Sequence, residues 1–102
     1  MMKILAMDTS NKALSLAILE NKETLGQVTL NIKKNHSITL MPAIDFLMNS
    51  LDMKPTNLDR IAVAQGPGSY TGLRIAVATA KTLAHTLKIE LVGVSSLLAL
   101  VP

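Results

Sequence analysis

The sequence predicts an α/β domain with a mixed five-stranded sheet, in the order β-β-β-α-β-α-β. Three short apolar segments bounded by turn residues come before residue 33, and such segments are typical of strands. Two longer segments, residues 39–51 and 71–87, repeat apolar residues at helical spacing. A short apolar segment follows each of these two helical segments, at residues 60–64 and 89–94. This alternation predicts helical crossovers onto a sheet whose faces the helices can cover.

The N-terminal part of the chain predicts a strand followed by a hairpin. Residues 3–7 (KILAM) form a short apolar strand that ends at a turn cluster beginning with Asp8, Thr9 and Ser10. Residues 13–19 and 25–32 then flank Glu20-Asn21-Lys22-Glu23, which we interpret as the turn of a hairpin.

The first helix is predicted over residues 39–51. Its apolar residues recur at helical spacing: Leu40, Ile44, Leu47 and Leu51. Ser37 or Thr39 can cap its N-terminus, and Pro42 is tolerable only within the first turn.

The remaining elements alternate between strand and helix. A break at Pro55-Thr56-Asn57 precedes a buried strand over residues 60–64, and a glycine-rich loop then leads into the second helix over residues 71–87. Residues 89–94 form the last strand. Because the apolar end SLLALVP stops after barely one helical turn, we expect residues 1–102 to be a single domain and a fragment of a longer, two-domain protein.

Composition excludes several classes of protein. The 102 residues are 49% apolar but only 2% aromatic, so the core is built from aliphatic residues, alanine and methionine. The absence of cysteine excludes a disulfide framework and fits a cytoplasmic protein. No segment reaches the roughly 18 apolar residues of a membrane span. The net charge of +3 does not by itself predict a nucleic-acid surface.

The loop QGPGSYTGL, residues 65–73, is the position where a phosphate could bind, because it follows a strand and opens a helix. The spacing of its residues argues against the known phosphate loops. A P-loop needs Gly-Lys followed by Ser or Thr, whereas Gly72 is followed by Leu73, and the third glycine comes one residue late for a dinucleotide fingerprint.

The second helix is too apolar for a helix that only covers a sheet. Its polar residues Arg74, Lys81, His85 and Lys88 share one narrow face, while Gly72, Ala76, Ala80 and Ala84 recur at every fourth position and permit close packing. Either the helix is deeply buried between the sheet and the first helix, or part of it is a partner surface. The first helix has the same apolar surplus, and together they favour an interface.

Three segments, MKILAMDTS, HSITLMP and QGPGSYTGLRIAVATAKTLA, together resemble the TsaB (YeaZ) family of tRNA threonylcarbamoyladenosine biosynthesis. The resemblance covers the whole chain and implies an actin-like, ribonuclease-H-like half-domain. It also implies a non-catalytic, cytoplasmic subunit that binds a related catalytic subunit, TsaD, through its first two helices. A small ATPase, TsaE, completes the bacterial complex, tRNA is bound only through the complex, and the chain pairs with itself when its partner is absent.

The resemblance implies an interface on the two helices. Its expected residues are His36, Leu40, Met41, Ile44, Met48, Tyr70, Thr71, Arg74, Ile75 and Ala78.

The resemblance also implies that catalytic groups are missing. The catalytic relative has two metal-binding histidines, and the corresponding positions here are Ser96 and Leu100, which are not plausible ligands for that metal. We therefore expect no catalytic residue, no metal and no cofactor. A vestigial nucleotide site is expected at Asp8, Thr9, Ser10, Gly66 and Gly68, where nucleotide binding would be weak; Asp8 is expected to cap backbone amides.

Two rival functions stay open from the sequence. One alternative is that the chain is the nucleotide-binding half of an actin-like ATPase or of a sugar-kinase-type phosphotransferase. Such a protein needs a second domain that contacts the adenine of the nucleotide. A peptidase, a label sometimes given to this family, has no metal triad or nucleophile–base pair in these residues to support it.

Overall fold

A computed structural model describes residues 2–9, 13–21, 23–31, 36–64 and 70–94 of the chain. The strands and helices follow the predicted order, with a short 3-10 helix before the fourth strand. The elements are β1 (Lys3–Thr9), β2 (Ala13–Glu20), β3 (Glu23–Asn31), α1 (His36–Ser50), η1 (Pro55–Asn57), β4 (Arg60–Ala64), α2 (Tyr70–Leu87) and β5 (Glu90–Val94).

The five strands form one mixed sheet in the order β3-β2-β1-β4-β5. Strands β1, β2 and β3 pair antiparallel, whereas β1, β4 and β5 pair parallel. The central strand β1 aligns Leu5 with Ile18 on one side and with Ile61 on the other. The predicted mixed five-stranded α/β sheet is therefore confirmed.

The N-terminal strands are longer than the sequence predicted. Asp8 and Thr9 belong to β1 and pair with Ser15 and Leu14, so the prediction that a turn begins at Asp8 is wrong. The reason is that β2 begins already at Ala13 and supplies backbone partners for the end of β1. At the other end of β2, Glu20 pairs with Glu23, which leaves a hairpin loop of two residues. Asn21 takes the positive φ of 51° that such a tight loop requires.

Helix α1 begins three residues earlier than predicted, at His36. Ser37 and Thr39 therefore lie inside the helix, and the prediction that one of them caps it is wrong. Pro42 lies in the second turn of α1, not in the first, so it has no N–H to donate to the carbonyl of Ile38. The side chain of Pro42 is exposed, so its ring lies away from the core.

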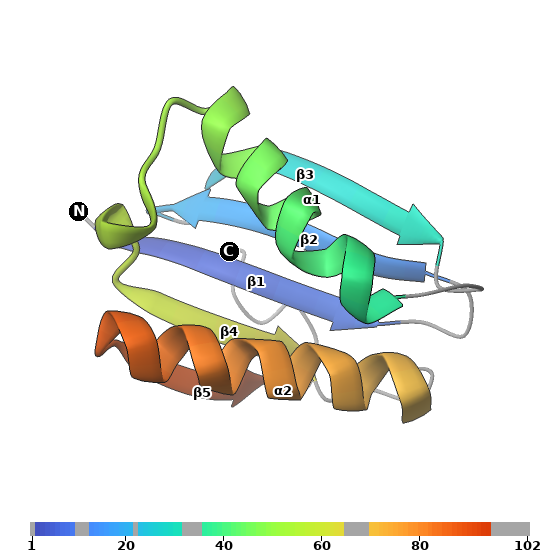
Figure 1. Cartoon of the computed structure of the whole chain (residues 1–102). Helices are drawn as coiled ribbons and strands as arrows, with labels where there is room; N and C mark the ends of the chain where they lie inside the picture. Colours follow the sequence, from blue (N-terminus) through green and yellow to red (C-terminus); the bar gives the residue numbers. More distant parts are fainter. Residues whose placement is uncertain (1, 10–12, 22, 32–35, 65–69, 95–102) are drawn as a thin grey trace.

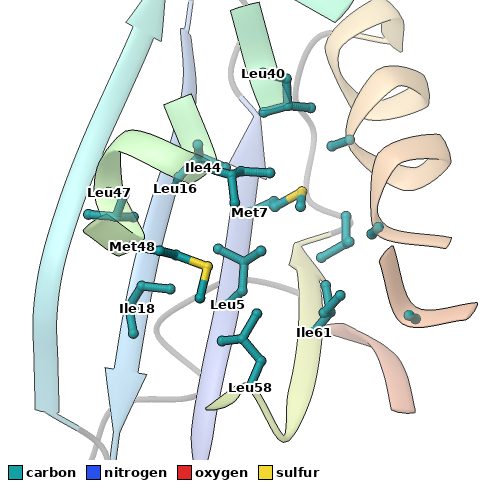
Figure 2. Close-up of a cluster of buried hydrophobic side chains, with 14 of the residues drawn as sticks. Leu5, Met7, Leu16, Ile18, Leu40, Ile44, Leu47, Met48, Leu58 and Ile61 are labelled. Carbon is teal, nitrogen blue, oxygen red and sulfur yellow. The ribbon is translucent and has the colours of Figure 1, made fainter. Parts of the chain in front are cut away.

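Both helices lie on the same face of the sheet, α1 across β2 and β3 and α2 along β4 and β5 (Figure 1). Figure 2 shows the core between the helices and the sheet. The fully buried larger side chains are Leu5, Met7, Leu16, Ile18, Leu40, Met48 and Ile61. In the described part of the chain, no helix is both long and apolar enough to cross a membrane.

Helix α2 lies against the sheet through small residues. Ala76 and Ala80 are fully buried and Ala84 is 7% exposed, and all three belong to the core cluster. Because their side chains are single methyl groups, the helix backbone lies close to the sheet. The predicted close packing along this flank of the helix is confirmed.

Both helices end in the same backbone motif. At the end of α1, the N–H of Met53 donates to the carbonyl of Met48 and the N–H of Asp52 donates to that of Asn49. At the end of α2, Ile89 and Lys88 donate in the same way to Ala84 and His85. These are Schellman motifs, in which the residue after the helix takes a left-handed conformation that glycine usually provides. Here Asp52 (φ 55°) and Lys88 (φ 57°) take it instead.

Candidate functional site

The first candidate site is the edge of the sheet where β1, β4 and β5 end, because ligands bind there in many open α/β sheets. Asp8 lies near the end of β1, is partly exposed, and points to the face opposite the two helices, since Leu5 and Met7 point toward them. Its neighbours across β2 and β3 are Ser15 and Thr29, whose hydroxyl oxygens lie 3.3 Å apart.

The predicted nucleotide site can be traced only in part. Asp8 and Thr9 are strand residues, whereas Ser10, Gly66 and Gly68 lie outside the described residues. Asp8 pairs with Ser15 in the ladder between β1 and β2, and the turn after β1 lies outside the described residues, so the nucleotide site stays a prediction. Within the described residues, no group of three or more His, Cys, Asp or Glu side chains could hold a metal ion. Ser96 and Leu100 also lie outside the described residues.

The outward surface of α1 is the second place, and it corrects the predicted interface. Leu40, Ile44 and Met48 are buried against the sheet in the core, so the prediction that they face a partner is wrong (Figure 2). The apolar repeat that indicated them is the stripe that packs on the sheet over β2 and β3. Met41, in contrast, is 42% exposed and lies where it can contact a partner.

Phe46 is the most exposed large apolar side chain of the described residues, at 66%, and the sequence analysis did not identify it. It lies one helical turn after the exposed Pro42, on the side of α1 that also carries Asp45 and Asn49. The sequence does contain a signal for Phe46, since the chain's one phenylalanine falls on the polar side of the predicted helix. An aromatic side chain on that side is unfavourable in water and indicates a contact.

The outward flank of α2 is the third place. Arg74 and Ala78 are exposed, and together with Val77 and Lys81 they line a surface hollow of about 410 Å³. The predicted interface positions Tyr70, Thr71 and Ile75 lie in α2, and His36 is the first residue of α1; their side chains are outside the described set. Both helices lie on one face of the sheet (Figure 1), and Val77 and Lys81 also line a second hollow together with Leu91 and Gly93 of β5.

We name the outward surface of the two helices the helical face and define it by Met41, Phe46, Arg74, Val77 and Ala78. The face combines an exposed aromatic ring, a flexible methionine, and a hollow with a cationic rim. Aromatic residues, methionine and arginine are the residue types that are enriched in protein–protein interfaces. The face offers no nucleophile–base pair among these residues, so its chemistry is that of contact.

Comparison with known proteins gives three results. The family model described as "TsaD: tRNA N6-adenosine threonylcarbamoyltransferase" matches residues 14–102. The tRNA threonylcarbamoyladenosine biosynthesis protein TsaB of Bacillus subtilis is 51% identical over 94% of this chain and 42% of its own length. The solved structure of YeaZ from Pseudomonas aeruginosa superposes with a TM-score of 0.82 at 34% identity, over 95% of this chain and 45% of that one.

A more distant structure shows the fold alone. RuvC of Thermus thermophilus, solved with a Holliday junction substrate, is 10% identical and superposes with a TM-score of 0.59 over 91% of this chain and 64% of that one. The fold is thus the actin-like, ribonuclease-H-like α/β fold that the sequence predicted. The chain spans less than half the length of the curated TsaB relative that it matches.

Proposed function

Because this chain belongs to the TsaB (YeaZ) family, whose curated members are named tRNA threonylcarbamoyladenosine biosynthesis proteins, we propose that it acts in that biosynthesis as a non-catalytic partner subunit. Its role is to bind a TsaD-like catalytic subunit through the helical face. The full assembly is cytoplasmic and includes a TsaE-like ATPase. When the catalytic subunit is absent, the same face pairs with a second copy.

The observation that carries this proposal is the exposure of Phe46 and Met41 on α1, a helix that covers the same face of the sheet as α2, whose surface has the hollow. An exposed phenylalanine contributes no packing to this chain, whereas an aromatic anchor that enters a partner's pocket contributes much of an interface's binding energy. The hollow beside Ala78 can receive a side chain from the partner in return. The two helices thus present a projecting group and a recess, which a related helical surface can complement.

The non-catalytic role rests on the residues that the fold brings to the sheet edge. Asp8 shares its row across the sheet with Ser15 and Thr29, which are neutral at physiological pH. Among the described residues of this row, Asp8 has no base or second acid beside it with which to divide proton transfers. We expect no hydrolysis of ATP or of a peptide that depends on Asp8. ATP hydrolysis that is lost in an Asp8→Ala variant would instead favour the actin-like ATPase alternative.

Binding of a purified TsaD-like subunit tests the interface. The variants are Phe46→Glu on α1 and Ala78→Arg on α2, each compared with a change to the same residue on η1, Thr56→Glu and Thr56→Arg, at an exposed position outside the helical face. We expect the helical-face variants to weaken binding at least about tenfold, roughly 1.4 kcal/mol, and the Thr56 variants to bind as the wild type does.

The same variants test self-association. Sedimentation of the chain alone is expected to show a dimer that Phe46→Glu converts to monomer, because an isologous contact carries each substitution twice. If both helical-face variants keep the wild-type affinity for the catalytic subunit and the wild-type mass, the interface lies elsewhere. Circular dichroism confirms that each variant is folded before its binding is compared.

A further inference from the structure

The C-terminal half of α2 differs from its N-terminal half in what it presents to solvent. From Lys81 onward, every exposed residue of the helix and its terminus is polar and can donate a hydrogen bond. These residues are Lys81, Thr82, His85, Thr86 and Lys88. The N-terminal half exposes Arg74 and Ala78 and, in part, Val77 and Thr79. The fully exposed residues of the C-terminal half, which we name the basic region, are thus all polar, whereas the N-terminal half also exposes apolar side chains beside Arg74.

The charges of the two helices are segregated. Residues 70–88 contain no aspartate or glutamate, and residues 36–53 contain no lysine or arginine but do contain Asp45 and Asp52. The carboxylate that follows α2 most closely in the sequence, Glu90, bonds to Arg60 at 3.1 Å. Both residues align with Ile4 across the sheet, on the face away from the helices. The basic region of α2 is thus not neutralised by its own helix or by Glu90.

Stabilisation of the helix end explains only part of this pattern. Cations in the last turn interact favourably with the helix dipole, and this accounts for His85 and Lys88. Lys81 lies six residues before the end of α2, beyond the reach of that effect. A rise of about 1.5 Å per residue places Lys81 and Lys88 roughly 10 Å apart along the helix, so the two ammonium groups can contact different phosphates of one nucleic acid.

We propose that Lys81, His85, Thr86 and Lys88 of this basic region contact the phosphate backbone of the tRNA substrate, whereas the Thr82 hydroxyl already donates to the carbonyl of Ala78 at 3.0 Å. The inference rests on the proposed function, from which the nature of the polyanion follows. Lysine, threonine and histidine side chains are donors to phosphate oxygens that position a nucleic acid without reading its sequence. Residues 70–88 carry Arg74, Lys81 and Lys88 without a carboxylate, so this helix has a local excess of positive charge.

The geometry separates this contact from the protein interface. The helical face lies at Ala78 and before it on α2, together with Met41 and Phe46 on α1, whereas the basic region begins at Lys81. A subunit bound at the helical face leaves the C-terminal half of α2 available to RNA. Lys81 lines the hollow from its basic end and marks the border between the two surfaces.

Salt-dependent binding to a purified unmodified tRNA tests the proposal, with the chain alone and in complex with the TsaD-like subunit. The double variant Lys81→Gln/Lys88→Gln lowers the net charge by two and is matched by Gln27→Glu/Thr56→Asp, which does the same at exposed positions on β3 and η1, outside both helices. We expect the lysine variant to bind tRNA about tenfold more weakly, and the salt slope of its binding to fall by roughly 1.5, since each phosphate contact contributes about 0.7 to 0.9. Lys81→Arg/Lys88→Arg should restore both quantities, and the matched control should bind as the wild type does.

Three outcomes overturn the proposal. These are wild-type affinity in the lysine variant, equal loss in the matched control, and loss of the catalytic subunit without loss of tRNA. The last outcome would assign the region to protein contact. Binding of the TsaD-like subunit by the same samples shows separately whether the proposed function stands, so failure of one inference is not mistaken for failure of the other.

Discussion

Single alanines decide how α2 is placed on the sheet. Ala76, Ala80 and Ala84 are buried, whereas Ala78 is exposed beside the hollow. The sequence alone could predict that an every-fourth repeat of small residues packs closely. It could not tell which flank of the wide apolar arc faces water, because that choice depends on how the helix is rotated on the sheet.

Arginine substitutions at two positions of α2 should have opposite consequences. We expect Ala84→Arg to lower the free energy of unfolding by more than about 3 kcal/mol, because it buries an unpaired charge in the core. Ala78→Arg should change it by less than about 0.5 kcal/mol, since the side chain extends into solvent. Urea unfolding followed by circular dichroism measures both. Equal losses for the two variants would mean that the assigned rotation of α2 is incorrect.

Gly26 is a second residue whose size matters. A Cβ built on it would lie 3.1 Å from a Cδ atom of Leu47 and 3.1 Å from one of Leu51, so α1 lies directly over this position of β3. Gly26→Val should therefore destabilise the chain by about 1–3 kcal/mol through overpacking, although valine favours strands. Unfolding in urea checks this, with Gln27→Val on the other face of β3 as the control. A stable Gly26→Val protein with an unstable Gln27→Val protein would contradict the placement of α1.

At the scale of elements, the sequence predicted the type and the order of the strands and helices correctly, but it placed several of their ends incorrectly. The strand over residues 60–64 and the second helix were found because a buried apolar run and a helical repeat are each bounded by clear breaking residues. The predicted start of α1 is three residues too late, because proline is expected in the first turn of a helix and Pro42 lies in the second turn. The interface residues Leu40, Ile44 and Met48 were misassigned because a core stripe and a contact stripe have the same composition. Only the position of the sheet separates them.

The left-handed residue that ends α1 gives a prediction for that element. Asp52→Gly should raise the free energy of unfolding by about 0.5–1 kcal/mol, since glycine takes a positive φ without the steric penalty of a Cβ. Asp52→Ala also removes the charge but keeps a Cβ, so it isolates the electrostatic contribution and should not stabilise the protein. Thermal unfolding of the three proteins provides the measurement. If Asp52→Ala stabilises as much as Asp52→Gly, the gain is electrostatic and the backbone explanation is wrong.

At the scale of the whole molecule, β1 holds the two halves of the sheet together. It pairs with the antiparallel hairpin on one side and with the parallel strands on the other, and Leu5, Ala6 and Met7 are fully buried. Its residues point alternately to the helix-covered core and to a smaller apolar cluster of Ala6, Leu19 and Ala62 on the opposite face. Strand β3, in contrast, is an edge strand whose side chains are exposed at alternate positions.

Amide hydrogen exchange should follow this arrangement. We expect the amides of Leu5, Ala6 and Met7 to exchange only on global unfolding, and the outward-facing amides of β3 to exchange several orders of magnitude faster. Exchange measured by NMR or mass spectrometry distinguishes the two strands. Slow exchange along the free edge of β3 would indicate that another strand is paired with it in solution, which would add a contact surface that the helical face does not explain.

The position of β1 in the sheet has a consequence for co-translational folding of the protein on the ribosome. Its antiparallel neighbour is synthesised immediately after it, but its parallel neighbour β4 begins only at Arg60 and α2 ends at Leu87. Helix α1, which covers the hairpin strands β2 and β3, ends at Ser50, whereas α2, which covers β1 and β4, ends 37 residues later at Leu87. At a translation rate of about 5–20 residues per second, the α2 side of β1 therefore stays uncovered for roughly 2 to 7 s longer than the hairpin. During those seconds we expect Leu5 and Met7 to be accessible to chaperones that bind nascent chains.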